Sequence, residues 1–466
     1  MSKKGRLLSV AVILTYAASA VWAQEKPERE VSEKLIGKID VSTVIGHSLT
    51  ASPDAKRFAY EASAGYKQWV VVDGKKGKEY CKVGDNYHYR PIFSPDSKRL
   101  AYQATIESSV EKMCGEKMCI VVDGKEGKEY DAVEWPVFSP DSKRIGYIAI
   151  AGGKVEGRLI LGGKKFIVVD GNEEKQYDRV LLPVFSPDSK RLAYCASVER
   201  EEGFPRTRED LVVVDGKEVS VYQNADINIP VFSPDSKRVA YSVDNREPQT
   251  NAEQGFVVLD GVPGKAYNRV GWWPVFSPDS NHIAYRAGIG KIIAPFHPVK
   301  ETFSKEFIVL DGKEQTLYDS VCGPLVFSPD GKRLAYAACG ERGWFIVVDG
   351  KEGKRCDITV LGLYCVFSPD SRRLAYKASA GEKKSVVVDE VEGKQYDDVR
   401  SLIFSPDSKS VAYIARTGDK EFVVVNGREG KQYDNILSEI IFDSDNVLHY
   451  LALSGNAVYL VEEKLK

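Results

Sequence analysis

The sequence predicts an all-β protein in which about ten similar sheets follow one another along a chain of 466 residues. Three observations support this prediction. A ten-residue string returns at intervals of 37 to 51 residues, each interval holds four short runs of strand-forming residues, and no part of the repeated unit has the apolar period of a helix. The repeat therefore replaces the usual expectation of about three separate domains.

Composition narrows the class of protein further. With 43% hydrophobic and 28% charged residues, the chain can bury a large core, which excludes disordered, collagen-like, coiled-coil and polytopic membrane proteins. The 65 basic and 67 acidic residues give a formal charge of -2. Because this balance creates no strong field, nucleic acid is not an expected partner.

Residues 1–23 have the pattern of a secretory signal peptide. Basic residues precede the apolar stretch Leu7–Trp22, and Val21 and Ala23 are the small residues expected before a cleavage site. An uncleaved membrane anchor is the alternative, although the run is short for a span of about 20 residues. We expect a periplasmic or secreted protein with no membrane span after cleavage, a charged segment at residues 24–37 and one folded domain at residues 38–466.

The repeated string is FSPDSKRLAY at Phe93–Tyr102. In every copy except the decayed last one, which begins at Phe442, Pro fixes one backbone angle of a tight turn. The Asp side chain can accept a hydrogen bond from the backbone two residues later. The copies are placed by this aspartate, which occurs at Asp54, Asp96, Asp141, Asp188, Asp235, Asp279, Asp330, Asp370, Asp407 and Asp445.

Each unit is expected to fold as four strands. A run such as Leu181–Ser186 enters the SPD turn, and the second strand, which contains the Ala-Tyr pair, leaves it. An aliphatic third strand such as Lys165–Asp170 ends in an Asp-Gly hairpin turn, and Lys175–Val180 then alternates apolar and polar residues as a fourth strand. Four strands in about 43 residues are the pattern of a β-propeller blade.

At this point the sequence resembles a known group, the TolB-like, WD-related propeller repeats of exported bacterial proteins. The shared feature is the F-S-P-D-[GS]-x-x-[IVL]-A-[FY] string, and the resemblance covers about residues 40–460, although no Trp-Asp dipeptide occurs. In that family the motif is structural. The resemblance therefore implies the fold and says little about function.

The last unit stops before a fourth strand, so we predict that the N-terminus supplies it. The segment Lys38–Val44 lies just before the first SPD turn and has strand character. Its pairing with the last blade would close one ring of about ten blades. Two smaller propellers are the alternative, but no linker interrupts the repeat.

One face of the predicted ring is uneven. The distance from the Ala-Tyr tyrosine to the Asp-Gly aspartate is 13 residues in unit 1 (Tyr60 to Asp73) and 19 to 26 residues in units 2 to 6. Loops between the second and third strands are therefore long in five adjacent blades. Long variable loops on a rigid scaffold are common binding elements. The SPD and Asp-Gly turns of the other face repeat so uniformly that we interpret their aspartates as structural.

Aromatic residues precede the first strand of several blades, near the expected mouth of the channel. Such residues can stack on a sugar or bind a peptide, and packing between blades is the alternative explanation. The candidate ligand-binding residues are Tyr87, Tyr89, Arg90, Trp135, Trp272, Trp273 and Tyr364.

Catalytic and metal motifs are missing from the sequence. It has no GxSxG elbow, no HExxH motif and no CxxC pair, so we predict no cofactor and no metal. A carboxylate pair such as Glu134 and Asp226 is the remaining possibility for catalysis. We expect a monomeric, non-enzymatic propeller that binds a protein, peptide or glycan of the cell envelope. The alternatives are a pore-mouth glycoside hydrolase or lyase and a structural envelope scaffold.

The eight cysteines are too few for a disulfide scaffold. Because the chain is expected outside the cytoplasm, we predict a Cys114–Cys119 bridge within one loop. We predict a second bridge, Cys322–Cys339, between neighbouring strands. Cys81 and Cys195 are expected to be free thiols.

Overall fold

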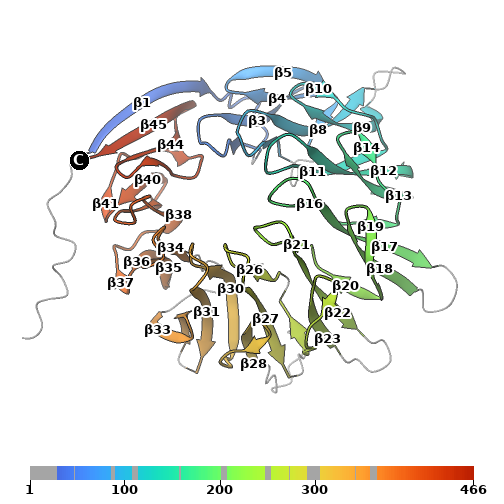
Figure 1. Ribbon diagram of the computed structural model, residues 1–466. Helices are drawn as coiled ribbons and strands as arrows, with labels where there is room; N and C mark the ends of the chain where they lie inside the picture. Colours follow the sequence, from blue (N-terminus) through green and yellow to red (C-terminus); the bar gives the residue numbers. More distant parts are fainter. Residues whose placement is uncertain are drawn as a thin grey trace, which may run out of the picture.

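The computed structural model describes residues 29–46, 48–84, 90–107, 114–156, 159–200, 207–246, 253–271, 273–290, 305–341, 343–356 and 365–466. These residues form ten sheets arranged as blades of one ring (Figure 1). The predicted all-β propeller with ten four-stranded blades is thereby confirmed. The alternative of two smaller propellers is wrong, because the ten blades share one ring.

Within each blade the chain runs outward from the centre of the ring, so the first strand is innermost and the fourth is outermost (Figure 1). Blade 1 contains β2 (Thr50–Ala51), β3 (Phe58–Ala64), β4 (Lys67–Val72) and β5 (Lys75–Tyr80). Blade 2 contains β6 (Lys82–Val83), β7 (Ile92–Phe93), β8 (Leu100–Glu107), β9 (Cys114–Val122) and β10 (Lys125–Glu126). Blade 3 contains β11 (Ala132–Phe138), β12 (Ile145–Glu156), β13 (Leu159–Val169) and β14 (Asn172–Glu173). Blade 4 contains β15 (Arg179–Val180), β16 (Val184–Phe185), β17 (Leu192–Arg200), β18 (Thr207–Val214) and β19 (Lys217–Gln223).

The next four blades repeat this plan. Blade 5 contains β20 (Ala225–Ile227), β21 (Val231–Phe232), β22 (Val239–Arg246), β23 (Glu253–Leu259) and β24 (Val262–Pro263). Blade 6 contains β25 (Arg269–Val270), β26 (Val275–Phe276), β27 (Ile283–Ile289), β28 (Lys305–Leu310) and β29 (Lys313–Glu314). Blade 7 contains β30 (Ser320–Phe327), β31 (Leu334–Gly340), β32 (Gly343–Val348) and β33 (Lys351–Cys356). Blade 8 contains β34 (Cys365–Phe367), β35 (Leu374–Ala380), β36 (Lys383–Val388) and β37 (Val391–Glu392).

The final blade combines both ends of the chain. Blade 9 contains β38 (Asp398–Phe404), β39 (Val411–Thr417), β40 (Lys420–Val425) and β41 (Arg428–Glu429). Blade 10 contains β42 (Asn435–Ile436), β43 (Ile441–Ser444), β44 (Val447–Ser454) and β45 (Ala457–Leu465), and its outer strand is β1 (Arg29–Lys38). β1 pairs antiparallel with β45 from Arg29 opposite Leu465 to Lys38 opposite Ala457.

An N-terminal strand therefore closes the ring as predicted, but the position predicted for it is wrong. The strand is Arg29–Lys38 and not Lys38–Val44. The Asp40 carboxylate accepts hydrogen bonds from the backbone N–H and the hydroxyl of Ser42, so that segment turns instead of extending. The propeller accordingly includes residues 29–37, which the sequence assigned to a separate charged segment.

The core lies between blades. Ten clusters of buried residues each combine side chains from two neighbouring blades, and one of them packs Leu451 and Val458 of blade 10 against Phe58 and Tyr60 of blade 1. Every junction of the ring, including the closing one, is therefore a hydrophobic interface.

Tyrosine pairs recur at these junctions. Tyr130, which follows the outer strand of blade 2, packs edge to face on Tyr147 of blade 3, with ring centroids 6.4 Å apart. The Tyr130 hydroxyl donates to Glu173 of blade 3 at 2.9 Å, and Lys128 forms an ion pair with the same carboxylate at 2.6 Å. Each such junction joins apolar packing to a polar link near the rim.

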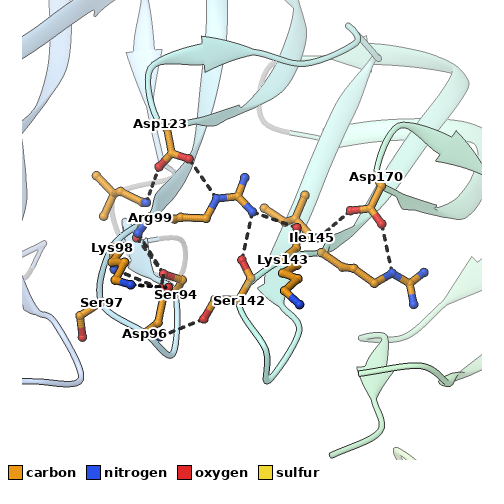
Figure 2. Close-up of polar contacts among 12 residues, drawn as sticks. Ser94, Asp96, Ser97, Lys98, Arg99, Asp123, Ser142, Lys143, Ile145 and Asp170 are labelled. Atoms are coloured by element: carbon orange, nitrogen blue, oxygen red, sulfur yellow. Dashed lines mark hydrogen bonds and ion pairs between the residues drawn. The ribbon is translucent and has the colours of Figure 1, made fainter. Parts of the chain in front are cut away.

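The SPD turns also connect neighbouring blades (Figure 2). The Ser94 hydroxyl donates to Asp96 at 2.6 Å, and the backbone N–H of Asp96 donates to Ser142 Oγ of the next blade at 2.9 Å. The same link between blades joins Asp54 to Ser97, and equivalent pairs occur at several other junctions.

The arginine of the repeated string completes the connection. Arg99 donates to Asp123 of its own blade at 3.0 Å and to the carbonyl oxygens of Ser142 and Lys143 of the next blade at 3.1 and 3.0 Å (Figure 2). Its guanidinium also lies over the Phe138 ring. The aspartates of both turns therefore have structural roles, as the sequence predicted.

Candidate functional site

Variation between blades concentrates on the face opposite the SPD turns. The hairpin of β12 and β13 has strands of 12 and 11 residues, whereas β3 and β4 of blade 1 have 7 and 6 residues. In blades 2, 4 and 5 the second and third strands are all at least as long as β3, the longer of the two strands in blade 1. These strands are β8 and β9, β17 and β18, and β22 and β23. The predicted tall hairpins are thus present in blades 2 to 5, and the inserted residues of blade 6 lie outside the described residues.

Three of the seven predicted binding residues lie within the described residues. Arg90 is exposed, Trp135 is 42% exposed and Trp273 is 55% exposed. Tyr87, Tyr89, Trp272 and Tyr364 lie outside the described residues. The two tryptophans belong to the first-strand region of blades 3 and 6 and are not part of the buried clusters between blades.

Trp135 has an unusual backbone conformation. It lies at a register shift of β11 between Glu134 and Val137, and its φ is +53°. A positive φ in a bulky side chain is a rare, strained conformation. The same place in the register shifts of blades 7 and 9 is occupied by Gly323 with φ +76° and Ser401 with φ +56°. Blade 3 therefore holds a large ring where blades 7 and 9 use small residues.

A cavity of about 690 Å³ opens in the inner wall of blades 8, 9 and 10. Its lining is mostly aliphatic and comes mainly from the first strands of these blades, with Lys377, Val386 and Tyr413 from second and third strands. The aliphatic and aromatic lining residues are Val366, Phe367, Pro369, Val386, Val399, Leu402, Ile403, Phe404, Tyr413, Ile440 and Ile441. Ser401, which holds the place in blade 9 that Trp135 holds in blade 3, also lines this cavity. The cavity therefore lies at the same height along the inner wall as Trp135.

Two basic side chains of the cavity are held by acidic partners. Lys377 contacts Asp398 at 2.7 Å, and Arg400 contacts Glu421 at 2.7 Å. Burial alone would raise the pKa of Asp398, but the ion pair with Lys377 outweighs it and lowers the pKa. Arg400 also donates to the carbonyl oxygen of Ile436 in blade 10 at 2.6 Å. These cations are therefore parts of the wall and are already neutralised.

The sequence did not predict this cavity. Its lining comes from inner-strand residues that are aliphatic in nearly every blade, so no single residue marks it. The available signal was the pair of basic residues, Lys377 and Arg400, at positions that are uncharged in most other units. A cavity made by three neighbouring blades becomes visible only when their relative positions are known.

The described residues contain no cluster of three or more side chains suited to hold a metal ion. Glu134 contacts Lys165 at 3.4 Å, whereas Asp226 contacts Arg208 at 3.0 Å, so the two carboxylates pair with different cations in different parts of the ring. Among the same residues, no helix is long and apolar enough to span a bilayer.

The predicted disulfides are not formed. Cys119, Cys322 and Cys339 form no disulfide, which contradicts both predicted bridges, whereas Cys81 is disulfide-bonded although it was expected to be a free thiol. Cys195 is free and buried, as predicted, and burial raises the pKa of its thiol to about 12.

Comparison with known proteins assigns the chain to no family. No family model and no curated protein matches the sequence. Similar solved structures include a eukaryotic initiation factor, with a TM-score of 0.47 and 12% sequence identity; the match covers 78% of this chain and 91% of that chain. The Dos1 propeller has a TM-score of 0.33 and 12% identity, and the match covers 94% of this chain and 95% of that chain. TolB from Acinetobacter baumannii has a TM-score of 0.25 and 15% identity, and the match covers 68% of this chain and 79% of that chain. Propellers thus occur among the similar structures, but likenesses at this level carry no inference about function.

Proposed function

We propose that this protein is a non-enzymatic binding propeller that holds a segment of polypeptide across the mouth of its channel, on the face of the long hairpins. The observation that carries the proposal is the backbone of Trp135. A non-glycine residue in a sparsely populated conformation costs on the order of 1 to 3 kcal/mol and occurs preferentially at functional sites. Because Trp135 is 42% exposed, burial of its ring recovers only part of that cost.

The aromatic ring and the aliphatic cavity together favour a peptide over a glycan. Exposed tryptophans can anchor either ligand, and they dominate the energy of many protein interfaces. A glycan, however, must find hydrogen-bond partners for its hydroxyl groups when they are buried. The aliphatic wall at the level of Trp135 offers few such partners, whereas an apolar side chain of a peptide fits it.

The location of the protein forms part of the proposal. The signal-peptide pattern at residues 1–23 supports export, and we place the mature protein in the periplasm or outside the cell. The repeated FSPD string supports an assignment to the TolB-like type of exported propeller. The partner is accordingly a protein or peptide of the cell envelope.

Substitution of Trp135 by Ser tests the proposal. Peptides selected from a display library on the wild-type protein, labelled with fluorescein, serve as probes for titration. We expect Trp135→Ser to weaken their binding by the roughly 1 to 3 kcal/mol of an aromatic anchor. The melting temperature should stay unchanged or rise, because Ser is the residue that blade 9 accommodates at the matching position with φ +56°.

The control is Val262→Ser, which changes another exposed apolar residue on the face of the turns, where Val262 is 68% exposed. It should leave the affinity unchanged. Unaltered affinity in Trp135→Ser, or a large fall in its melting temperature, would contradict the proposal. Binding of an arrayed oligosaccharide that depends on Trp135, with no selected peptide, would instead support a glycan-binding propeller.

A further inference from the structure

We infer that the cavity of blades 8 to 10 is a specificity pocket for one large neutral side chain of the bound polypeptide, and that the residues flanking this side chain are basic. This inference rests on the proposed peptide-binding function and extends it to the sequence of the ligand. It follows from the size of the cavity, the charge of its wall and the charge at its mouth.

The cavity has the dimensions of a binding site. Ligand pockets in proteins are commonly about 300 to 1,000 Å³ in volume and mostly apolar, with few polar groups. The volume here is about 690 Å³, and Val366, Leu402 and Ile441 bring aliphatic side chains from three successive blades. A leucine or phenylalanine side chain would exchange water for apolar contacts on all of these walls.

An interruption of β38 shapes the opening. The ladder between β38 and β39 pairs Arg400 with Ile414 and then Ile403 with Ala412, so the register shifts at Ser401 and Leu402. Ser401 has a φ of +56° at this point. A bulge of this kind bends a strand and re-aims its side chains, and bulges are common beside binding sites. The wall of blade 9 is thus shaped differently from an uninterrupted strand.

The basic residues of the wall do not favour an acidic ligand. Lys377 is engaged with Asp398, and Arg400 is engaged with Glu421 and with a backbone carbonyl. A ligand carboxylate would have to compete with these partners for the same N–H groups. Replacing one partner of a partly buried ion pair leaves the other charge without compensation. The net charge of the cavity wall is therefore close to zero, because each of its two cations is paired with a carboxylate.

The charge at the mouth is negative. Glu439 lines the cavity and is exposed, and no contact among the described residues pairs its carboxylate with a cation. An exposed carboxylate beside an apolar pocket attracts positive groups and repels negative ones. A peptide with Lys or Arg next to the inserted side chain is complementary to this arrangement.

Three synthetic nonapeptides labelled with fluorescein test the inference by fluorescence anisotropy. Their centres are Lys-Phe-Lys, Glu-Phe-Glu and Lys-Gly-Lys in the same Gly-Ser context. Wild-type protein should bind the Lys-Phe-Lys peptide at least tenfold more tightly than either of the others. Equal binding of the three peptides would overturn the inference. Preference for Glu-Phe-Glu would also overturn it and would indicate an acidic ligand.

Two substitutions connect this preference to the cavity. Val366→Trp fills the cavity, and we expect at least a tenfold loss of affinity for the Lys-Phe-Lys peptide. The matched control is Val326→Trp in blade 7, where the same position of the FSP string lies outside the cavity lining. Val326→Trp should bind like the wild type. Equal affinities of the two variants would contradict the inference.

Glu439→Lys provides a test that does not depend on the folding of the first variant, because Glu439 is exposed. This variant should bind the Lys-Phe-Lys peptide at least threefold more weakly than the wild type does. It should bind the Glu-Phe-Glu peptide at least threefold more tightly. Unchanged affinities would contradict the inferred flanking charge. If Trp135→Ser weakens the selected peptides while Val366→Trp and Glu439→Lys bind normally, the proposed function stands and only the pocket is wrong. If Trp135→Ser has no effect either, the proposed function fails as well.

Discussion

Residues of the repeated string form hydrogen bonds between neighbouring blades, so a residue that departs from the string should change the stability of the protein. In blade 7 Gly331 replaces the serine of the SPD turn. Its φ is +75°, and a Cβ at this position would lie 2.6 Å from Asp279 Cγ of the preceding blade. The side chain of Asp279 thus occupies space that a serine would need.

We predict that Gly331→Ala destabilises the protein through this contact. The control is Gly350→Ala, because Gly350 has the same φ of +75° and no atom within 4 Å of an added Cβ. Both variants carry the cost of a positive φ, but only Gly331→Ala must displace Asp279. We expect an additional loss of about 1 to 3 kcal/mol in Gly331→Ala, the usual cost of overpacking. Chemical denaturation measures the difference, and equal stabilities would contradict the prediction.

The cysteines show where reasoning from single residues failed. A bridge between Cys114 and Cys119 requires the chain to turn between them. In the structure β9 extends from Cys114 to Val122. The Cα atoms of residues five apart in one strand are separated by about 16 Å, too far for a disulfide. The length of the hairpin was readable from the sequence, but its regular extension was not.

At the scale of the element, β1 is the least expected strand. Half of the residues of its sequence REVSEKLIGK are charged, and this composition predicts a charged segment before the folded domain. The outer strand of a blade pairs on one edge only and contacts solvent on both faces, so it does not need apolar alternation. β1 also supplies specific contacts between blades, since Glu33 accepts hydrogen bonds from Lys431 and Tyr433 of blade 9. It therefore takes the place of the outer strand in the repeat, contacts included.

Arg29 is the residue of β1 whose loss should cost most. It pairs with Glu463 at 2.9 Å, where the side chains are 10% and 0% exposed, and it donates to the carbonyl oxygens of Val423 and Arg428 in blade 9. Arg29→Ala leaves a buried carboxylate without its cation. We expect a loss of about 3 to 5 kcal/mol in the free energy of unfolding, as for other broken buried pairs.

The control for Arg29 is the double variant Arg29→Met with Glu463→Gln, which removes both charges and keeps similar volumes. It should recover a large part of the stability lost in Arg29→Ala. Lys34→Ala, at an exposed position of the same strand, should change little. A melting temperature of Arg29→Ala equal to that of Lys34→Ala would contradict the assigned role of Arg29 in closure.

At the scale of the whole molecule, the sequence predicted what the repeat dictates and missed what the arrangement of blades creates. The number of blades, the strand order and the structural role of the SPD turns follow from one local pattern repeated ten times. The cavity of blades 8 to 10 instead depends on how three blades meet. The strain at Trp135 depends on one register shift in β11. Neither feature has a signature within a single unit.

The repetition also makes the response to pH a property of the whole ring. The aspartates of the SPD turns accept hydrogen bonds from a serine hydroxyl and from the backbone in blade after blade, and these bonds lower the pKa of each carboxyl group. For Asp279, bonds from Ser277 and Asn281 lower the pKa to about 2. At the other extreme, burial raises the pKa of Tyr147 and of Tyr413 to about 12.

The direction of each contribution follows from linkage. A carboxyl group with a lowered pKa stabilises the native state fully above its pKa in the unfolded chain, near 4, and this stabilisation disappears as the pH falls toward 2. A tyrosine with a raised pKa stabilises the native state below about pH 10, and this is lost as the pH rises toward 12. We therefore predict a melting temperature that is nearly constant from pH 5 to 9 and falls below pH 4 and above pH 10. Calorimetry across this range measures the profile, and Asp279→Asn should reduce the acid slope because one titrating group is removed. A melting temperature that is the same at pH 2.5 and pH 6 would show that the hydrogen bonds of the turn carboxylates do not stabilise the native state.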